Sequence, residues 1–163
     1  MDILNNEFLL FLKCAQENSL RYLLIGGYAV NYYGYNRHTA DMDIWLAPDN
    51  KNKQAFINTL LCMNYSQKEV EPLTNEDFSA HFVGTIGSAD AAIDVLTFVH
   101  RSISYTEAEN QKNVFEIQPG LFLNIVPYQM LIEMKLRSHR EKDMFDIARL
   151  EEIKNQQDPD KKT

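Results

Sequence analysis

The chain has 163 residues, of which 45% are hydrophobic and 24% are charged. This length fits one compact domain with its own core, and no apolar run is long enough to cross a membrane. The formal net charge is −7, which disfavours a protein that follows a nucleic-acid backbone, because such proteins usually present a basic patch. The charge suits a small cationic acceptor or a protein partner better, and a local basic groove remains an alternative.

The N-terminal segment, residues 3–18, predicts an amphipathic helix, because its apolar side chains recur at helical spacing. The first residues lack the basic region of a secretory signal, so we expect a cytoplasmic location. Cys14 lies in this segment and Cys62 lies in a second predicted helix, residues 50–63. Both are isolated in apolar surroundings, and we interpret them as reduced core thiols, not as a disulfide or a metal-binding pair.

A glycine pair follows the first predicted strand. Residues 22–25 form a short apolar run that ends at Gly26 and Gly27, and residues 28–33 predict a short helix that Gly34 ends. In a strand–glycine–helix layout, backbone N–H groups can face an anion, and glycine lets a phosphate approach closely. The alternative is a simple tight turn.

Two aspartates, Asp41 and Asp43, come one residue apart in the next predicted strand, residues 41–46. Apolar and polar residues alternate here, which is typical of a half-buried strand. The two carboxylates then share one face, about 7 Å apart. Mg²⁺ is commonly bound by one or two carboxylates together with substrate phosphates, so the pair predicts a metal site. Two solvated aspartates are the alternative, although aspartate is depleted in strands.

A third carboxylate, Asp94, is the only charge in the apolar segment 91–99. This segment predicts a strand that pairs with another beginning at His81, while the polar residues 64–78 predict a loop. A buried aspartate requires a partner, which a metal, an arginine or backbone N–H groups could each provide. If segment 91–99 lies beside the Asp41–Asp43 strand, three carboxylates meet and require cations to neutralise them.

The remaining segments complete the predicted scaffold. Residues 100–112 are polar and predict a mobile flap, and residues 113–126 predict a hairpin that turns at Pro119 and Gly120. Residues 155–163 are predicted to be a disordered tail, which leaves residues 1–154 as a single domain. No internal repeat or linker divides the chain.

Two further helices are predicted, over residues 128–138 and 142–153. Lys135 lies on the first, where a lysine near a triphosphate would act as a point charge. Asp143 and Asp146 lie near the start of the second. Acidic residues there also favour the helix dipole or form a solvated charged face, so their role stays open.

These motifs together resemble the nucleotidyltransferase superfamily typified by DNA polymerase β. Gly26-Gly27, the sequence Arg-His-Thr-Ala-Asp-Met-Asp-Ile at residues 37–44, and the later Asp94 are similar to its front motif. Residues 131–136 (Leu-Ile-Glu-Met-Lys-Leu) and 140–148 (Arg-Glu-Lys-Asp-Met-Phe-Asp-Ile-Ala) look like a second signature of its small bacterial and archaeal branch. That branch includes antibiotic nucleotidyltransferases and components of toxin–antitoxin and abortive-infection systems.

The resemblance implies an α/β fold with a short mixed sheet and helices packed mainly on one face. It implies transfer of a nucleoside monophosphate from an NTP, expected to be ATP, to an acceptor hydroxyl, with release of pyrophosphate. Two Mg²⁺ ions are expected, and the residues implied are metal ligands, phosphate-cradling glycines and cationic phosphate contacts: Asp41, Asp43 and Asp94; Gly26 and Gly27; Arg37 and Lys135.

The acceptor is expected to be a small molecule or a partner protein, and a homodimer that completes the cleft is a further expectation. Neither strong nucleic-acid binding nor a membrane location is expected. Two alternatives stay open: an antitoxin-like enzyme that modifies a partner protein, and a non-catalytic module that binds a nucleotide or a protein.

Overall fold

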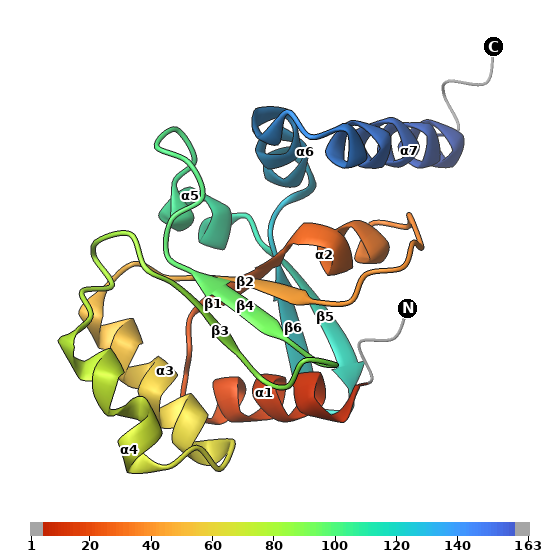
Figure 1. The fold of residues 1–163 in the computed structure, drawn as a ribbon. Coiled ribbons are helices and arrows are strands. Elements are labelled where there is room, and N and C mark those ends of the chain that lie inside the picture. Colours follow the sequence, from red (N-terminus) through yellow and green to blue (C-terminus); the bar gives the residue numbers. More distant parts are fainter. Residues whose placement is uncertain (1–4, 159–163) are drawn as a thin grey trace.

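A six-stranded mixed sheet organises the molecule (Figure 1). The computed structural model describes residues 5–158. The strand order is β3-β4-β2-β1-β6-β5, in which β2 runs antiparallel to β1 and parallel to β4, and β1 runs parallel to β6. The strands are β1 (Tyr22–Ile25), β2 (Met42–Leu46), β3 (Val83–Ile86), β4 (Ile93–Leu96), β5 (Asn113–Gln118) and β6 (Leu121–Ile125).

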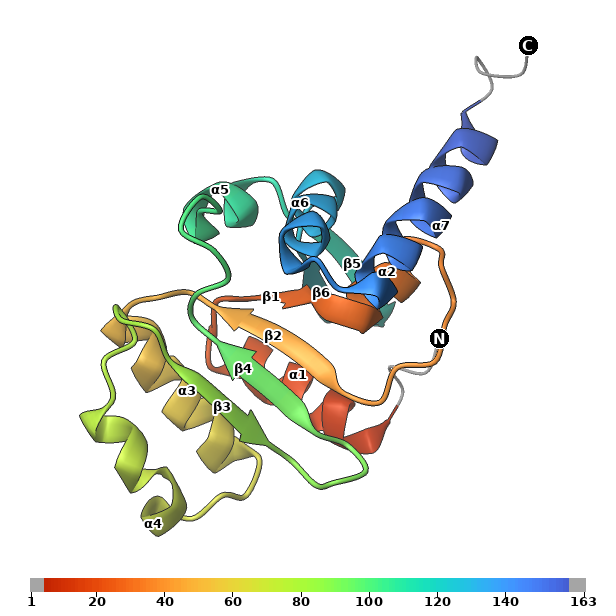
Figure 2. The ribbon, with the colours of Figure 1, turned by 45° about the horizontal axis from the view of Figure 1, so that its top comes forward.

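Helices flank the sheet on both sides. Their bounds are α1 (Asn6–Glu17), α2 (Gly26–Tyr32), α3 (Asn50–Cys62), α4 (Gln67–Val70), the 3-10 helix η1 (Glu71–Asn75), α5 (Tyr105–Asn110), α6 (Tyr128–Ser138) and α7 (Glu141–Gln157). The expected layer on one face is formed by α1 and α3, and α2, α5 and α6 add cover on the opposite side (Figures 1 and 2). The far end of α7 projects from the body (Figure 2).

The central strand β2 is covered on both faces, whereas the sequence predicted a half-buried strand. Trp45 is only 1% exposed, since its ring packs edge-on against Tyr105 of α5 with centroids 5.1 Å apart. Its Nε1–H also donates to the Thr97 carbonyl oxygen at 3.3 Å. This packing fixes the strand that carries Asp43.

Two segments predicted as a loop and a flap contain short helices. Residues 64–78 form α4 and η1, and Ser66 begins α4 with a capping box in which Ser66 and Glu69 each accept from the other's backbone N–H. Residues 100–112 contain α5, which Ser104 caps and which buries Tyr105. The prediction of a loop over residues 64–78 is therefore corrected, and the segment predicted as a flap contains a helix that buries Tyr105 and Ala108.

The C-terminal helix is longer than predicted. Helix α7 continues through Gln157, so residues 155–157 are helical and do not belong to a disordered tail. Asp158 follows the helix as its C-cap, and the last five residues of that predicted tail, 159–163, lie outside the described residues, as do residues 3 and 4 of the first predicted helix. Within the part of the chain that the structure describes, no helix is long and apolar enough to cross a membrane.

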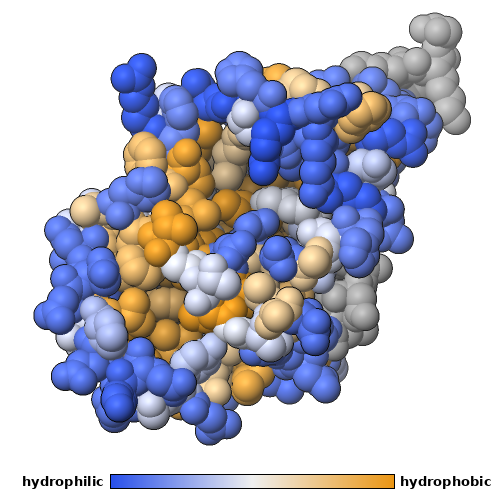
Figure 3. Space-filling model, in the orientation of Figure 1, coloured by the Kyte–Doolittle hydropathy of each residue, from blue (hydrophilic) through white to orange (hydrophobic). Residues whose placement is uncertain are grey.

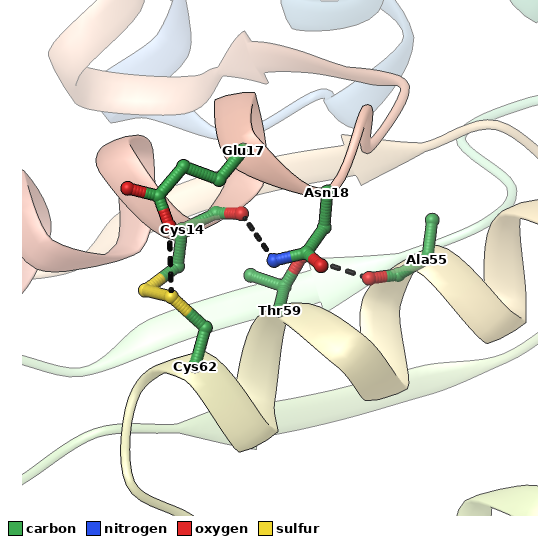
Figure 4. Close-up of a disulfide and its surroundings, with 6 residues drawn as sticks. All are labelled: Cys14, Glu17, Asn18, Ala55, Thr59 and Cys62. Carbon is green, nitrogen blue, oxygen red and sulfur yellow. Dashed lines mark hydrogen bonds between the residues drawn. A yellow bond between two sulfur atoms is a disulfide. The ribbon is translucent and has the colours of Figure 1, made fainter.

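Cys14 and Cys62 form a disulfide, so the prediction of two reduced thiols was wrong (Figure 4). Helices α1 and α3 pack against each other and bring the two Cα atoms to 5.7 Å, although 48 positions separate them in the sequence. Glu17 Oε2 lies 3.5 Å from Cys62 Sγ. The spacing of two isolated cysteines gives no signal of such tertiary proximity, which depends on how the helices pack.

Candidate active site

Three carboxylates line one cavity of about 470 Å³ at the end of β2. The condition set in the sequence analysis is met, because β2 and β4 are parallel neighbours whose register sets Asp43 directly opposite Asp94. Asp41 immediately precedes β2 and lines the same cavity. Asp94 is further held by Thr85 of β3, whose hydroxyl donates to Asp94 Oδ1 at 2.6 Å.

The position of Asp43 is electrostatically unfavourable for a carboxylate. Burial raises its pKa from 3.8 to about 6, and the charges of Asp94 and Asp41 push it in the same direction. Lys135 and Arg140 oppose the rise but do not cancel it. A cation bound among these oxygens would relieve the repulsion and lower the pKa of Asp43 again.

The chemistry of this donor set fits Mg²⁺, which takes oxygen ligands. Among residues 5–158, no three His, Cys, Asp or Glu side chains are grouped closely enough to hold a metal ion by themselves. Mg²⁺ does not require such a cage, because it usually keeps several waters and shares phosphate oxygens with one or two carboxylates. The arrangement therefore suits a metal that arrives with its substrate.

The glycine pair allows a close approach between α2 and the carboxylates. Gly26 has a φ of +69°, and a Cβ atom there would lie 2.1 Å from Asp43 Oδ2. A Cβ atom on Gly27 would lie 2.5 Å from Thr39 Oγ1. A side chain at either position would therefore require Asp43 or Thr39 to shift, and both glycines line the cavity. Their predicted contact with phosphate remains a prediction.

The two cations predicted to contact phosphate, Arg37 and Lys135, belong to a buried ion-pair cluster with Asp143 and Asp146. The Lys135 Nζ donates to Asp143 Oδ1 and Asp146 Oδ2, each at 2.9 Å. The Nε of Arg37 lies 2.8 Å from Asp146 Oδ1, and its Nη2 donates to Oδ2 at 2.9 Å. This cluster ties α6 and α7 to the segment before β2.

Asp143 gains two further partners at the corner between α6 and α7. Its Oδ2 accepts from Ser138 Oγ at 2.5 Å and from Arg140 Nε at 2.8 Å. Burial alone would raise the pKa of Asp143, but the hydrogen bonds from Ser138 and Lys135 outweigh it and lower the pKa to about 2. The sequence left the roles of Asp143 and Asp146 open, and the structure shows that both are buried and paired.

A comparison with solved structures identifies the fold. The chain matches the crystal structure of the lincosamide antibiotic adenylyltransferase LnuA in its lincomycin-bound form, with a TM-score of 0.52 and 14% identity. The match covers 91% of this chain and 97% of that one. The chain has the nucleotidyltransferase fold. No family model matches the sequence, and no curated protein matches it.

The nucleotidyltransferase fold confirms the predicted α/β architecture with its mixed sheet. Because the two sequences are only 14% identical, the likeness shows the fold alone, and the reaction depends on the residues of the site. Two cavity residues that the sequence did not single out as site residues are Thr39 and Lys142. The signal for both was their position inside the two motifs: Thr39 lies two residues from Arg37 and from Asp41, and Lys142 lies next to Asp143, whose role the sequence left open.

Proposed function

We propose that the chain is a Mg²⁺-dependent nucleotidyltransferase that moves a nucleoside monophosphate from an NTP, ATP in the first instance, to an acceptor hydroxyl. The observation that carries the proposal is the convergence of Asp41, Asp43 and Asp94 on one cavity of a nucleotidyltransferase fold. The raised pKa of Asp43 supports it, because a binding module gains little from crowded carboxylates.

In the proposed reaction, Asp41 and Asp43 would hold Mg²⁺ that arrives with the triphosphate, and Asp94 would help to hold a second ion. The metal, when bound, lowers the pKa of the acceptor hydroxyl and neutralises charge on the phosphoryl oxygens. Asp94, which Thr85 holds by a hydrogen bond, orients the acceptor hydroxyl and receives its proton. The acceptor oxygen forms a bond to the α-phosphorus, the bond to the bridging oxygen breaks, and pyrophosphate leaves.

The acceptor has an open approach along the sheet face next to Asp94. Val83 and Leu96 face each other two register positions along from Thr85 and Asp94, so all four side chains share this face. Val83 is 65% exposed, and the nearby Phe98 is 44% exposed. Figure 3 shows hydrophobic surface gathered in the middle of this side of the molecule. Such a surface suits an acceptor with an apolar body, whether a small molecule or a partner protein.

The test is transfer of label from α-³²P ATP with Mg²⁺ and a lysate of the host organism, comparing wild type with Asp43→Asn. We expect label on an acceptor with the wild type, no label with the variant, and a variant melting temperature no lower than that of wild type. Label on a small molecule would indicate a metabolite- or antibiotic-modifying enzyme, and label on a protein band would indicate an antitoxin-like partner-modifying enzyme. Retained transfer in Asp43→Asn would overturn the proposal.

A further inference from the structure

The cavity is lined by several basic side chains, and they differ in how many of their donors are already paired. Lys135 is 5% exposed, and its Nζ donates to two carboxylates. Arg37 presents two nitrogens to Asp146, and its Nη1 donates to the His38 carbonyl oxygen at 3.3 Å. Although both residues line the cavity, the nitrogens of these two cations are therefore already paired with protein oxygens.

Arg140 and Lys142 are in the opposite situation. The Arg140 side chain is 74% exposed and uses only Nε, toward Asp143, so its two terminal nitrogens make no ion pair or hydrogen bond with any described residue. Lys142 is exposed and likewise forms no ion pair within residues 5–158. Both side chains line the cavity that contains Asp43.

The distribution of charge in the cavity indicates that the paired and the unpaired cations have different roles. Within the buried ion-pair cluster, Arg37 and Lys135 balance Asp143 and Asp146, so the cluster as a whole is neutral. This leaves the exposed Arg140 and Lys142, at the start of α7, in the same cavity as the three carboxylates, which lie on or beside β2 and β4. A metal-bound triphosphate matches this arrangement, because its metal side can face the carboxylates while its remaining oxygens face the cations.

We propose that Arg140 and Lys142 bind the triphosphate, and that Arg37 and Lys135 stay in the buried ion-pair cluster that fixes the α6–α7 corner. This inference rests on the proposed nucleotide-handling function. It replaces the sequence-based expectation that Arg37 and Lys135 contact phosphate. In their place it assigns Arg140 and Lys142, because the terminal nitrogens of both side chains form no ion pair with a described residue.

The experiment is calorimetric titration of the full chain with two probes, Mg²⁺–ATP and metal-free tripolyphosphate. We expect the double variant Arg140→Gln/Lys142→Gln to lose roughly tenfold or more in affinity for both probes. Its melting temperature should fall less than that of Lys135→Gln, because it loses only the bond from the exposed Arg140 to Asp143. Lys51→Gln, which removes an exposed lysine of α3 on the other side of the sheet, is the matched control and should bind as wild type.

Lys135→Gln distinguishes the two sets of cations. We expect it to lower the melting temperature, while its affinity for tripolyphosphate, measured where the variant is folded, stays within about threefold of wild type. An affinity loss in Lys135→Gln as large as in the Arg140/Lys142 double variant would overturn the inference. Wild-type affinity in the double variant would do the same.

Asp43→Asn in the same series separates this inference from the proposed function. We expect Asp43→Asn to lose Mg²⁺–ATP binding but to keep tripolyphosphate binding, because it retains both cations. If the wild type binds tripolyphosphate through Arg140 and Lys142 but does not bind Mg²⁺–ATP, the proposed function fails while the anion site stands. If Mg²⁺–ATP binds in an Asp43-dependent way but without Arg140 and Lys142, the function stands and this inference fails.

Discussion

At Asp43, burial and two neighbouring carboxylates act in the same direction and raise the pKa from 3.8 to about 6. The folded state therefore binds a proton at Asp43 more tightly than the unfolded state does. The stability that this protonation contributes is fully present below pH 3.8 and is lost as the pH rises through about 6. The full rise corresponds to up to roughly 3 kcal/mol.

Asp43→Asn is accordingly expected to be more stable than the wild type at pH 7, by up to roughly 3 kcal/mol, and nearly equal to it at pH 4. Urea unfolding of both proteins between pH 4 and pH 7, without metal, measures the difference. Parallel stability curves over this range would contradict the electrostatic account of Asp43.

The same raised pKa predicts how metal binding depends on pH. A protonated carboxyl group is a poor ligand, so stabilisation of the wild type by Mg²⁺ with ATP should weaken as the pH falls below about 6. Melting temperatures at fixed ligand concentrations, from pH 5 to pH 8, measure this dependence. A ligand-induced shift that stays constant across the range would argue against metal binding at Asp43.

Asp146 offers a test of the buried ion-pair cluster. Its side chain is 1% exposed and pairs with Lys135 and Arg37, so Asp146→Asn should cost about 3–5 kcal/mol by leaving buried cations with too few partners. Asp49→Asn is the control, because the exposed Arg21–Asp49 pair should contribute at most about 1 kcal/mol. Equal losses of unfolding free energy in the two variants would contradict the structural role of the cluster.

Residue by residue, the sequence selected three carboxylates that line one cavity in the structure, but it did not predict that the two selected cations would be ion-paired. Asp41, Asp43 and Asp94 were selected because acidic residues in apolar strands need an explanation. Arg37 and Lys135 were selected for their charge, but whether a cation is free or paired depends on tertiary contacts with Asp143 and Asp146. Nothing in the linear sequence specifies those contacts.

At the scale of elements, the disulfide joins α1 to α3 and closes a loop that contains β1, α2 and β2. For a separation of 48 residues, the loss of chain entropy in the unfolded state corresponds to about 4 kcal/mol. We expect a reductant to lower the melting temperature of the wild type. The double variant Cys14→Ala/Cys62→Ala should melt at a lower temperature that does not respond to reductant.

Thiol titration of the unfolded, unreduced protein provides the direct check on this bond. Among the described residues both cysteines are in the disulfide, so no free thiol should react before reduction and two should react afterwards. Two reactive thiols before reduction would contradict the pairing and restore the interpretation of reduced core thiols.

Helix signals were present in both segments predicted as irregular. Ser66 and Ser104 are each followed three positions later by glutamate, which is the sequence pattern of a capping box. In the structure, both serines accept a hydrogen bond from the backbone N–H of that glutamate. These segments are highly polar, and their helices are too short to show the repeating apolar pattern by which a helix is predicted.

At the scale of the whole molecule, the sequence predicted the pairing of strands that follow each other in the chain, but not the pairing of strands far apart in the chain. The hairpins β3–β4 and β5–β6 follow from short turns between neighbouring strands. The parallel pairing of β2 with β4 was only a condition in the prediction, and that of β1 with β6 was not predicted at all. The resemblance of two separated motifs to one family indicated the fold before these pairings were known, and the structural match supports it.

The most direct test of nucleotidyl transfer follows the α-phosphate and the γ-phosphate of ATP separately. ATP labelled with ³²P on the α-phosphate in one sample and on the γ-phosphate in another is incubated with the protein, Mg²⁺ and host lysate. We predict that α-label appears on the acceptor and γ-label only in pyrophosphate, and that neither change occurs with Asp43→Asn. Transfer of γ-label to an acceptor would show phosphoryl transfer instead, and would contradict the nucleotidyltransferase assignment.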